Sequence, residues 1–377
     1  AFVFLVTLFT LILCSRLEDE SLNIPHYEIQ NDNIQKKQDI SSFFDIKTIL
    51  VSEEAGYRIP NMALCFEYID STLFLINFTP VGSVIALGID GTIKWDMAAN
   101  DDPLTAFSTL SGYFFDRRNK VINIFDTQKN RVYQYDFNGI FLGVEKVNLY
   151  MNDVFILEDG TRLFSTTAYR NEFEQGGRKA ALVSYSADNK NHQPDSVLLW
   201  YDLYNPNSMP FLSVNDFTND LDDRLYYRRN YDDTIFQIKD LVAEPFLTFS
   251  FTMGDRRREI QTSKNGNPMV TQQFLDENVP YADYIAPVSK YLMGQCVYNG
   301  KYFFTMIDME SKGTVVNAST YTCNGIELTG RLNYSRGMLL NQMYAGNYFQ
   351  LNEHPSGLVL SDVQKENIVY TILTPKW

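Results

Sequence analysis

The chain has 377 residues, of which 45% are hydrophobic and 21% are charged, values that exclude a wholly disordered or collagen-like protein. Its formal net charge of -14 would repel a phosphate backbone, so we exclude DNA and RNA as partners. The 27 Phe and 24 Tyr, together with many β-branched residues, favour pleated strands over helices.

The chain begins with a charge-free apolar run, residues 1–13, that stops at Cys14. This run is too short to cross a bilayer, which needs about 20 residues, but it matches the apolar core of a secretory signal. We therefore predict export. Because the run starts at Ala1 without a basic leader, we expect further residues before it in the natural precursor.

An apolar run that ends at a lone cysteine resembles a bacterial lipoprotein signal, with residues 1–14 as the leader. The resemblance implies that Cys14 carries lipid and anchors the protein in the outer membrane, with the domain periplasmic or surface-exposed. Leu13 departs from the small residue usual at that position, and a cleaved, soluble secretory form is the alternative. Residues 15–42 are polar and are predicted to form a flexible tether between the anchor and a folded domain at 43–377.

A repeated β unit organises the folded domain. Two strands and an Asp90-Gly91 turn are echoed by two further strands and an Asn138-Gly139 turn, 48 residues later. Asx-Gly turns between alternating apolar segments are typical of hairpins, and a period of about 40 to 50 residues is typical of propeller blades. The repeat predicts one six-bladed β-propeller of four-stranded antiparallel blades rather than two or three domains.

In chain order we place the blades at about 43–97, 107–149, 154–201, 211–253, 284–333 and 343–377. The early segment Ile46–Val51 is expected to complete the last blade and close the ring. Residues 254–283 lack alternation and are expected to form a long excursion on one face, where binding residues often lie.

The fourth blade carries a family resemblance. Its segments Arg224–Arg228, Asp233–Ile238 and Glu244–Phe251 resemble a blade of the six-bladed β-propeller lipoproteins of Bacteroidetes, relatives of NHL-type propellers. Residues 119–126 and 135–139 of the second blade resemble them too. The family implies no settled activity and no catalytic residues. One departure is the loop after the first blade, where residues 100–103 replace the usual Gly-Pro-Gly-Glu-type sequence.

A Tyr and Arg cluster in the fourth blade is the candidate ligand-binding surface: Tyr226, Tyr227, Arg228, Arg229 and Tyr231. Tyrosine rings stack on sugars, and arginines form forked hydrogen bonds to carboxylates. Alternate residues of a strand face opposite sides, so Tyr226 and Tyr227 cannot both face the same neighbour. Packing between blades is the competing interpretation and the commoner role of such residues.

No catalytic residue is predicted. Three dispersed histidines, at positions 26, 192 and 354, form no cluster, and Gly-x-Ser-x-Gly and phosphate-binding loops are missing from the sequence. Acidic pairs such as Asp101-Asp102 and Asp222-Asp223 leave open a calcium site built from several blades, as in lactonases of this architecture. Cys296 and Cys323 fall in one predicted blade, and buried free thiols are favoured over a disulfide.

These observations favour a non-enzymatic binding module at the bacterial cell envelope, without a cofactor, for a glycan, a peptide or a protein partner. Its contact with a membrane would be through the lipid anchor alone. One alternative is a calcium-dependent lactonase or esterase-like hydrolase on the same fold. The second alternative is a structural subunit of an outer-membrane assembly.

Overall fold

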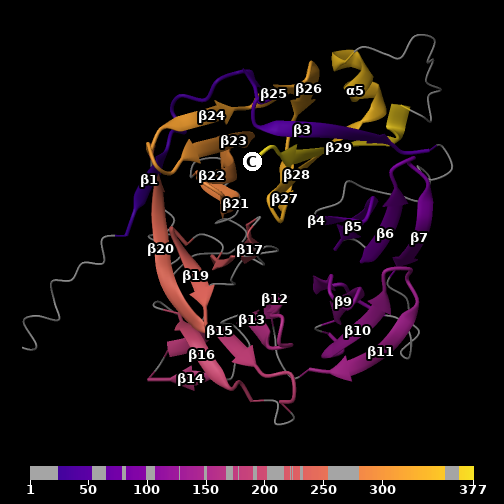
Figure 1. Cartoon of the computed structure of the whole chain (residues 1–377), viewed down its shortest axis with the longest axis vertical. Coiled ribbons are helices and arrows are strands. Elements are labelled where there is room, and N and C mark those ends of the chain that lie inside the picture. Colours follow the sequence, from indigo (N-terminus) through magenta and orange to yellow (C-terminus); the bar gives the residue numbers. More distant parts are fainter. Residues whose placement is uncertain are drawn as a thin grey trace, which may run out of the picture.

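The computed structural model describes residues 24–52, 65–78, 82–98, 107–126, 128–147, 151–166, 173–176, 178–189, 193–201, 216–220, 222, 224–229, 232–253, 280–352 and 365–377. Within these ranges the chain is almost entirely β, and its sheets stand around a central axis as the blades of a β-propeller (Figure 1). The prediction of an all-β propeller with four-stranded antiparallel blades is confirmed. The leader with Cys14 and most of the 254–283 excursion lie outside the described residues.

The strands of the described residues form seven sheets. Six of them contain a four-stranded antiparallel ladder, and we number these sheets 1 to 6 in chain order. The seventh, which we call the small sheet, has three strands, β2 (Gln38–Asp39), β25 (Thr320–Cys323) and β26 (Ile326–Thr329).

Sheet 1 consists of β4 (Cys65–Ile69), β5 (Thr72–Asn77), β6 (Ser83–Gly88) and β7 (Ile93–Ala98). Sheet 2 consists of β8 (Gly112–Asp116), β9 (Val121–Asp126), β10 (Arg131–Asp136) and β11 (Phe141–Lys146). Sheet 3 consists of β12 (Met151–Ile156), β13 (Arg162–Thr166), β15 (Arg178–Tyr185) and β16 (Ser196–Trp200), with β14 (Glu174–Gln175) paired to β15.

Sheet 4 consists of β17 (Phe217–Asn219), β18 (Leu225–Tyr227), β19 (Thr234–Lys239) and β20 (Val242–Phe251), with β1 (His26–Ile29) at its edge. Sheet 5 consists of β21 (Tyr281–Val288), β22 (Tyr291–Tyr298), β23 (Lys301–Asp308) and β24 (Thr314–Ala318). Sheet 6 consists of β27 (Leu332–Ser335), β28 (Met338–Tyr344), β29 (Ile368–Pro375) and β3 (Phe44–Leu50), and helix α5 (Ala345–Leu351) follows β28.

The first strand of each sheet lies toward the axis. Figure 1 places β4, β12, β17, β21 and β27 near the centre and β7, β11, β20 and β3 at the periphery. Neighbouring inner strands contact one another, β8 with β12, β12 with β17, β17 with β21 and β27 with β4. Side chains from different sheets therefore meet at the axis although they are far apart in the sequence.

The Asx-Gly turns form as the sequence predicts. The Asp90 carboxylate accepts the Thr92 amide at 3.1 Å, and Gly91 adopts a φ of 81°. In the second turn Gly139 has a φ of 80°, and the carboxylate of Asp136, two residues before Asn138, accepts the Ile140 amide at 2.8 Å. A positive φ is inexpensive for glycine, so each turn reverses the chain in register for the outer strand of its sheet.

The hydrophobic core consists of layers between sheets. Six clusters of buried side chains join sheet 1 with 2, 2 with 3, 3 with 4, 4 with 5, 5 with 6 and 6 with 1. The last of these joins Ile49 and Tyr370 of sheet 6 to Phe66 and Leu75 of sheet 1. Each sheet thus buries both of its faces against neighbours, which is why one sheet alone would be unstable.

The ring is closed by the expected early strand. β3 pairs antiparallel with β29, with Ile49 opposite Tyr370 and Lys47 opposite Ile372. A segment near residue 50 thereby becomes the outer strand of the sheet that ends near the C-terminus. The prediction that Ile46–Val51 completes the last blade is confirmed.

Residues 24–42 do not form the flexible tether that their polarity suggests. β1 pairs in parallel with β20, and its alternate residues Tyr27 and Ile29 are buried. Further along, Gln35 bridges to Ala318 of β24, and β2 pairs in parallel with β25. We call residues 24–40 the strap, because they run along the edges of sheets 4 and 5 and the small sheet.

The boundaries of the last two predicted blades are wrong. Sheet 5 ends at Ala318 rather than at residue 333, and residues 320–329 form β25 and β26 of the small sheet. Sheet 6 begins at Leu332 rather than at residue 343, and the sequence did not predict helix α5. The alternation of apolar residues cannot show which sheet each of these strands belongs to. Strands of sheet 5, sheet 6 and the small sheet all bury residues in one hydrophobic cluster.

Two further findings concern cysteines and membranes. Cys65, Cys296 and Cys323 are buried free thiols, which confirms the preference for thiols over a disulfide. In the described part of the chain no helix has the length and apolarity to cross a bilayer.

Candidate ligand-binding site

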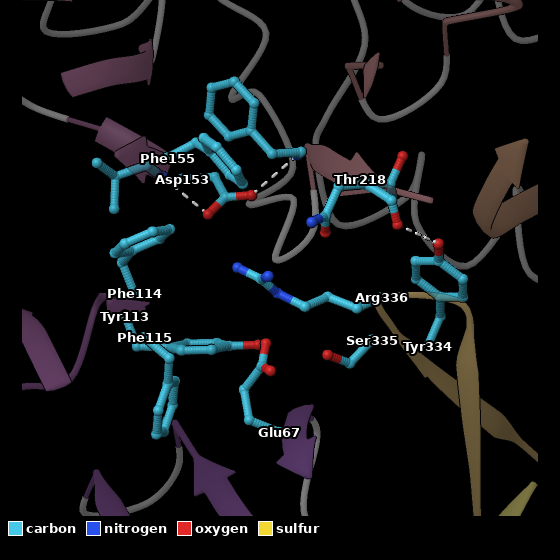
Figure 2. A pocket seen from close by; sticks show the side chains of 13 residues that line it. Glu67, Tyr113, Phe114, Phe115, Asp153, Phe155, Thr218, Tyr334, Ser335 and Arg336 are labelled. Atoms are coloured by element: carbon cyan, nitrogen blue, oxygen red, sulfur yellow. Dashed lines mark hydrogen bonds between the residues drawn. The ribbon is translucent and has the colours of Figure 1, made fainter. Parts of the chain in front are cut away.

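A pocket opens at the axis of the propeller, lined by inner strands of five sheets (Figure 2). We call it the channel pocket; its cavity volume is about 60 Å³, and it opens to solvent. Its polar lining residues are Glu67, Asp153, Thr218, Asn219, Ser335 and Arg336. Its aromatic walls are Tyr113, Phe114, Phe115, Phe155, Phe217 and Tyr334. Apolar walls with a few convergent polar groups are typical of small-molecule sites.

Arg336 is positioned by a tight hairpin. Ser335 pairs with Met338 across the two-residue turn Arg336-Gly337, whose φ angles are 46° and 79°. These positive φ values are those of the turn type that matches strand twist. The Arg336 side chain extends from this turn across the pocket (Figure 2). Nearby, the Tyr334 hydroxyl donates to the Asn219 carbonyl at 2.9 Å and joins sheet 6 to sheet 4.

Glu67 lines the opposite side of the pocket and is held by an ion pair. The Arg117 guanidinium, which follows β8, lies 2.6 Å from the Glu67 carboxylate. Both side chains are partly screened from solvent, so the pair is stronger than an exposed one. It fixes the Glu67 carboxylate at the boundary between sheets 1 and 2.

Asp153 is the second acidic group in the pocket wall. Its carboxylate accepts backbone amides of Val154 at 2.8 Å, Asp216 at 2.9 Å and Phe217 at 3.1 Å. Burial, and then the neighbouring Asp216 carboxylate, raise the pKa of Asp153 well above its usual value. The ionised form of this carboxylate is thus less favoured than that of an exposed aspartate.

Asp216 lies behind this wall and connects sheets 3 and 4. It is buried and accepts a hydrogen bond from the Ser165 hydroxyl. The same hydroxyl lies 3.1 Å from the Tyr227 hydroxyl. The acidic groups at the axis are thus tied into the contacts between sheets.

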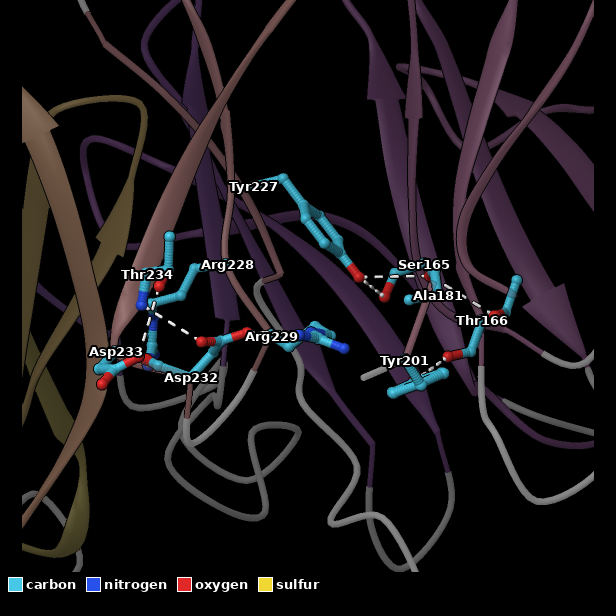
Figure 3. Close-up of polar contacts among 10 residues, drawn as sticks. All are labelled: Ser165, Thr166, Ala181, Tyr201, Tyr227, Arg228, Arg229, Asp232, Asp233 and Thr234. Carbon is cyan, nitrogen blue, oxygen red and sulfur yellow. Dashed lines mark hydrogen bonds and ion pairs between the residues drawn. The ribbon is translucent and has the colours of Figure 1, made fainter. Parts of the chain in front are cut away.

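The structure places the predicted Tyr and Arg residues in contacts between sheets (Figure 3). Tyr226 packs on Phe246 in the cluster shared by sheets 4 and 5. Tyr227 faces the other way, in the cluster of sheets 3 and 4, and donates to the Ala181 carbonyl at 3.3 Å. Both rings are fully buried, so neither can stack on a ligand from solvent.

The two arginines of this group also have protein partners. Arg228 is buried, donates to the Ala282 carbonyl of sheet 5 at 3.2 Å and lies over the Phe249 ring. Arg229 pairs with Asp232 at 2.6 Å and lies over the Tyr201 ring at 5.1 Å. Tyr231 lies outside the described residues. The competing interpretation, packing between blades, accounts for the four residues that the structure places.

The alternative function, a calcium-dependent hydrolase, requires a metal site. Within the described ranges, no three His, Cys, Asp or Glu side chains converge to hold a metal. Asp101, Asp102 and Asp223 lie outside those ranges, and Asp222 is ion-paired with Arg224. His26 is exposed and contacts the Thr248 and Ser250 hydroxyls, at 2.9 and 3.0 Å; the other two histidines are outside the described residues.

The channel pocket was not predicted from the sequence. Its lining residues come from five separate segments, and no local motif unites them. One usable signal exists: Glu67, Asp153 and Arg336 all belong to the first strand or first hairpin of a repeat unit, which in a propeller faces the axis.

Comparison with known proteins places the chain in a family. A family model described as "6-bladed beta-propeller", DUF5128, matches residues 106–334, more than half of the chain. The chain belongs to the DUF5128 family. No curated protein matches this DUF5128 member in sequence. The predicted propeller family is therefore confirmed as a propeller, while its lipoprotein and NHL-like character stays a prediction.

Two solved structures share the fold of this DUF5128 member. A putative exported protein from Bacteroides fragilis matches with a TM-score of 0.66 and 13% identity, over 94% of this chain and 100% of that chain. A member of the DUF4221 family from Bacteroides vulgatus matches with a TM-score of 0.54 and 10% identity, over 88% of this chain and 97% of that chain. At these identities the likeness concerns the fold alone.

Proposed function

We propose that this protein is an exported propeller that binds a small carboxylate-bearing ligand, such as a sugar acid, in the channel pocket. The observation that carries the proposal is the Arg336 guanidinium extending into an aromatic-walled pocket at the axis (Figure 2). A guanidinium matches a carboxylate with two parallel hydrogen bonds. The Thr218 and Ser335 side chains supply hydroxyl partners for the rest of the ligand.

We also infer that the ring has six blades, sheets 1 to 6, and that the small sheet is an outer addition. Six inter-sheet clusters close the circle, and the buried residues of the small sheet belong to the cluster between sheets 5 and 6. The description of the matching family model agrees with this count.

Export and lipidation at Cys14 remain part of the proposal. They are supported by the apolar leader, residues 1–14, and by a structural neighbour that is itself described as a putative exported protein. A lipid at Cys14 would place the strap between the membrane anchor and the propeller.

The test is calorimetric titration of the purified protein with a panel of sugar acids and hydroxy acids. Galacturonate and galactose form a matched pair, because they differ by one carboxylate. We expect saturable binding of an acid and at least tenfold weaker binding to Arg336→Gln, because a charge-assisted hydrogen bond contributes about 1.5 to 3 kcal/mol.

Arg118→Gln is the matched control. Arg118 lies in the β8–β9 turn, donates to the Glu158 carbonyl at 2.9 Å and does not line the pocket. Its affinity for the acid should equal that of the unmodified protein. Equal affinity for acid and neutral sugar, unchanged affinity in Arg336→Gln, or no binding of any acid in the panel would contradict the proposal.

A further inference from the structure

A second, larger pocket lies on sheet 6, between the start of β27, the end of β28 and helix α5. We call it the sheet-6 groove; its cavity volume is about 480 Å³, and it opens to solvent. Its size suits a ligand of one or a few sugar units. Arg336 and Asp153 do not line it, so it is separate from the channel pocket.

The polar lining of the groove consists mainly of carboxamides. Asn333, Gln342, Asn347 and Gln350 all contribute, and no lining residue is acidic. A carboxamide offers both donors and an acceptor, as a sugar hydroxyl does. The one charged lining residue, Arg331, lies 2.6 Å from the Asp283 carboxylate, so its charge is compensated within the protein. This chemistry favours an uncharged, hydroxyl-rich ligand.

An exposed aromatic ring completes the groove. Tyr344 lines it with 46% of its surface exposed, at the junction of β28 and α5. In this chain most tyrosines that the structure describes are buried between sheets, so an exposed ring beside four carboxamides stands out. The face of an aromatic ring packs on the apolar C–H face of a pyranose, and its hydroxyl can remain hydrated.

The backbone of helix α5 is held at both of its ends. The Asn352 side chain donates to the Glu327 and Tyr348 carbonyls, each at 3.1 Å, and accepts the Glu327 amide at 2.6 Å. Ala345 is buried at the start of the helix and donates its amide to the Asn367 carbonyl at 2.7 Å. A ligand that binds there does not have to order the helix backbone, which lowers the entropic cost of binding.

Within the helix, Asn347 and Gln350 are three residues apart and therefore lie on the same side of it. Both are exposed and both line the groove together with Tyr344. The aromatic ring of Tyr344 and the carboxamides of Asn347 and Gln350 can thus contact the same ligand in the groove.

We propose that the sheet-6 groove is a binding site for a neutral saccharide, which stacks on Tyr344 and forms hydrogen bonds with the carboxamides of Asn347 and Gln350. The site is independent of the carboxylate site proposed for the channel, in both its residues and its ligand.

The test is calorimetric titration of the full chain with neutral xylo-, cello-, manno- and galacto-oligosaccharides. We expect at least one to bind saturably in the millimolar range or better. Tyr344→Ala should weaken that binding about tenfold, whereas Tyr344→Phe, which keeps the ring, should stay within about threefold of the unmodified protein.

The carboxamides have a matched control. Gln350→Ala should weaken binding about fivefold, because one hydrogen bond is lost. Gln128→Ala, an exposed glutamine in a turn of sheet 2, should leave it unchanged. Circular dichroism and thermal melts of each variant separate loss of binding from loss of fold.

Three outcomes would overturn the inference: no neutral oligosaccharide of the panel binds in the millimolar range, Tyr344→Ala binds as tightly as the unmodified protein, or Tyr344→Phe loses binding as fully as Tyr344→Ala. Binding of galacturonate that Arg336→Gln abolishes, with none of any neutral sugar, would support the channel site and reject this one.

Discussion

Gly91 shows how one residue serves both a turn and the closure of the ring. Its φ of 81° permits the hairpin between β6 and β7. Its α-carbon also faces the end of β3, where an added Cβ would lie 1.9 Å from the Leu50 carbonyl oxygen. The Ser52 amide donates to the Gly91 carbonyl at 2.9 Å. The turn of sheet 1 is thus in direct contact with the closing strand of sheet 6.

Gly91→Ala should destabilise the protein more than a positive φ alone explains. Gly325 has the same φ of 81° but open space around its α-carbon, so Gly325→Ala isolates the backbone cost of about 1 to 2 kcal/mol. The overlap with Leu50 should add about 1 to 3 kcal/mol in Gly91→Ala. Denaturant unfolding of both variants measures the difference, and equal losses would show that the Leu50 contact is relieved without cost.

At the scale of elements, the strap is a paired and packed segment, although its polar composition predicts a flexible tether. Tyr27 and Ile29 of β1 are buried, while His26 and Glu28 point outward. β1 is held by parallel pairing with a strand about 220 residues away, Ile29 lying opposite Phe251. Its inward residues join the cluster between sheets 4 and 5.

Ile29→Ala should therefore cost about 2 to 5 kcal/mol of unfolding free energy, as a cavity in a packed core does. Ile140, with 61% of its surface exposed, is the matched control, and Ile140→Ala should stay within about 0.5 kcal/mol. Denaturant titration of the two variants compares them directly. A neutral Ile29→Ala would mean that the segment behaves as the tether its polarity suggested.

The outcome at this scale shows what local pattern can predict. Hairpins such as β6–β7 and β10–β11 were predicted because the turn residues and the alternation lie within about 20 residues. The closing strand was predicted because the last blade lacked a partner. The strap was not predicted, because its alternation of polar and apolar residues covers only the four residues of β1 within a polar segment. The channel pocket was missed because Glu67, Asp153 and Arg336 are brought together only by ring closure.

At the scale of the whole molecule, stability depends on a circular chain of contacts. Each of the six inter-sheet clusters is shared by two sheets, and the cluster between sheets 6 and 1 depends on β3. If β3 detaches, sheet 6 loses its outer strand and, at the same time, the part of its contact with sheet 1 that Ile49 supplies, while Leu340 and Tyr370 of the inner strands remain in that cluster. The last sheet and the first sheet are therefore joined by packing that a linear array of sheets would lack.

The substitution Ile49→Asp tests this dependence. Ile49 is buried in the cluster between sheets 6 and 1, and an unpaired carboxylate there should cost about 4 kcal/mol or more. Thr48 is exposed on the opposite face of the same strand, so Thr48→Asp should change stability by less than about 1 kcal/mol. Because the ring closes through β3, Ile49→Asp should lower the midpoint of the whole unfolding transition, followed by tyrosine fluorescence and circular dichroism together. Local loss of protection in β3 with an unchanged global midpoint would show that the remaining five inter-sheet clusters hold the propeller without closure.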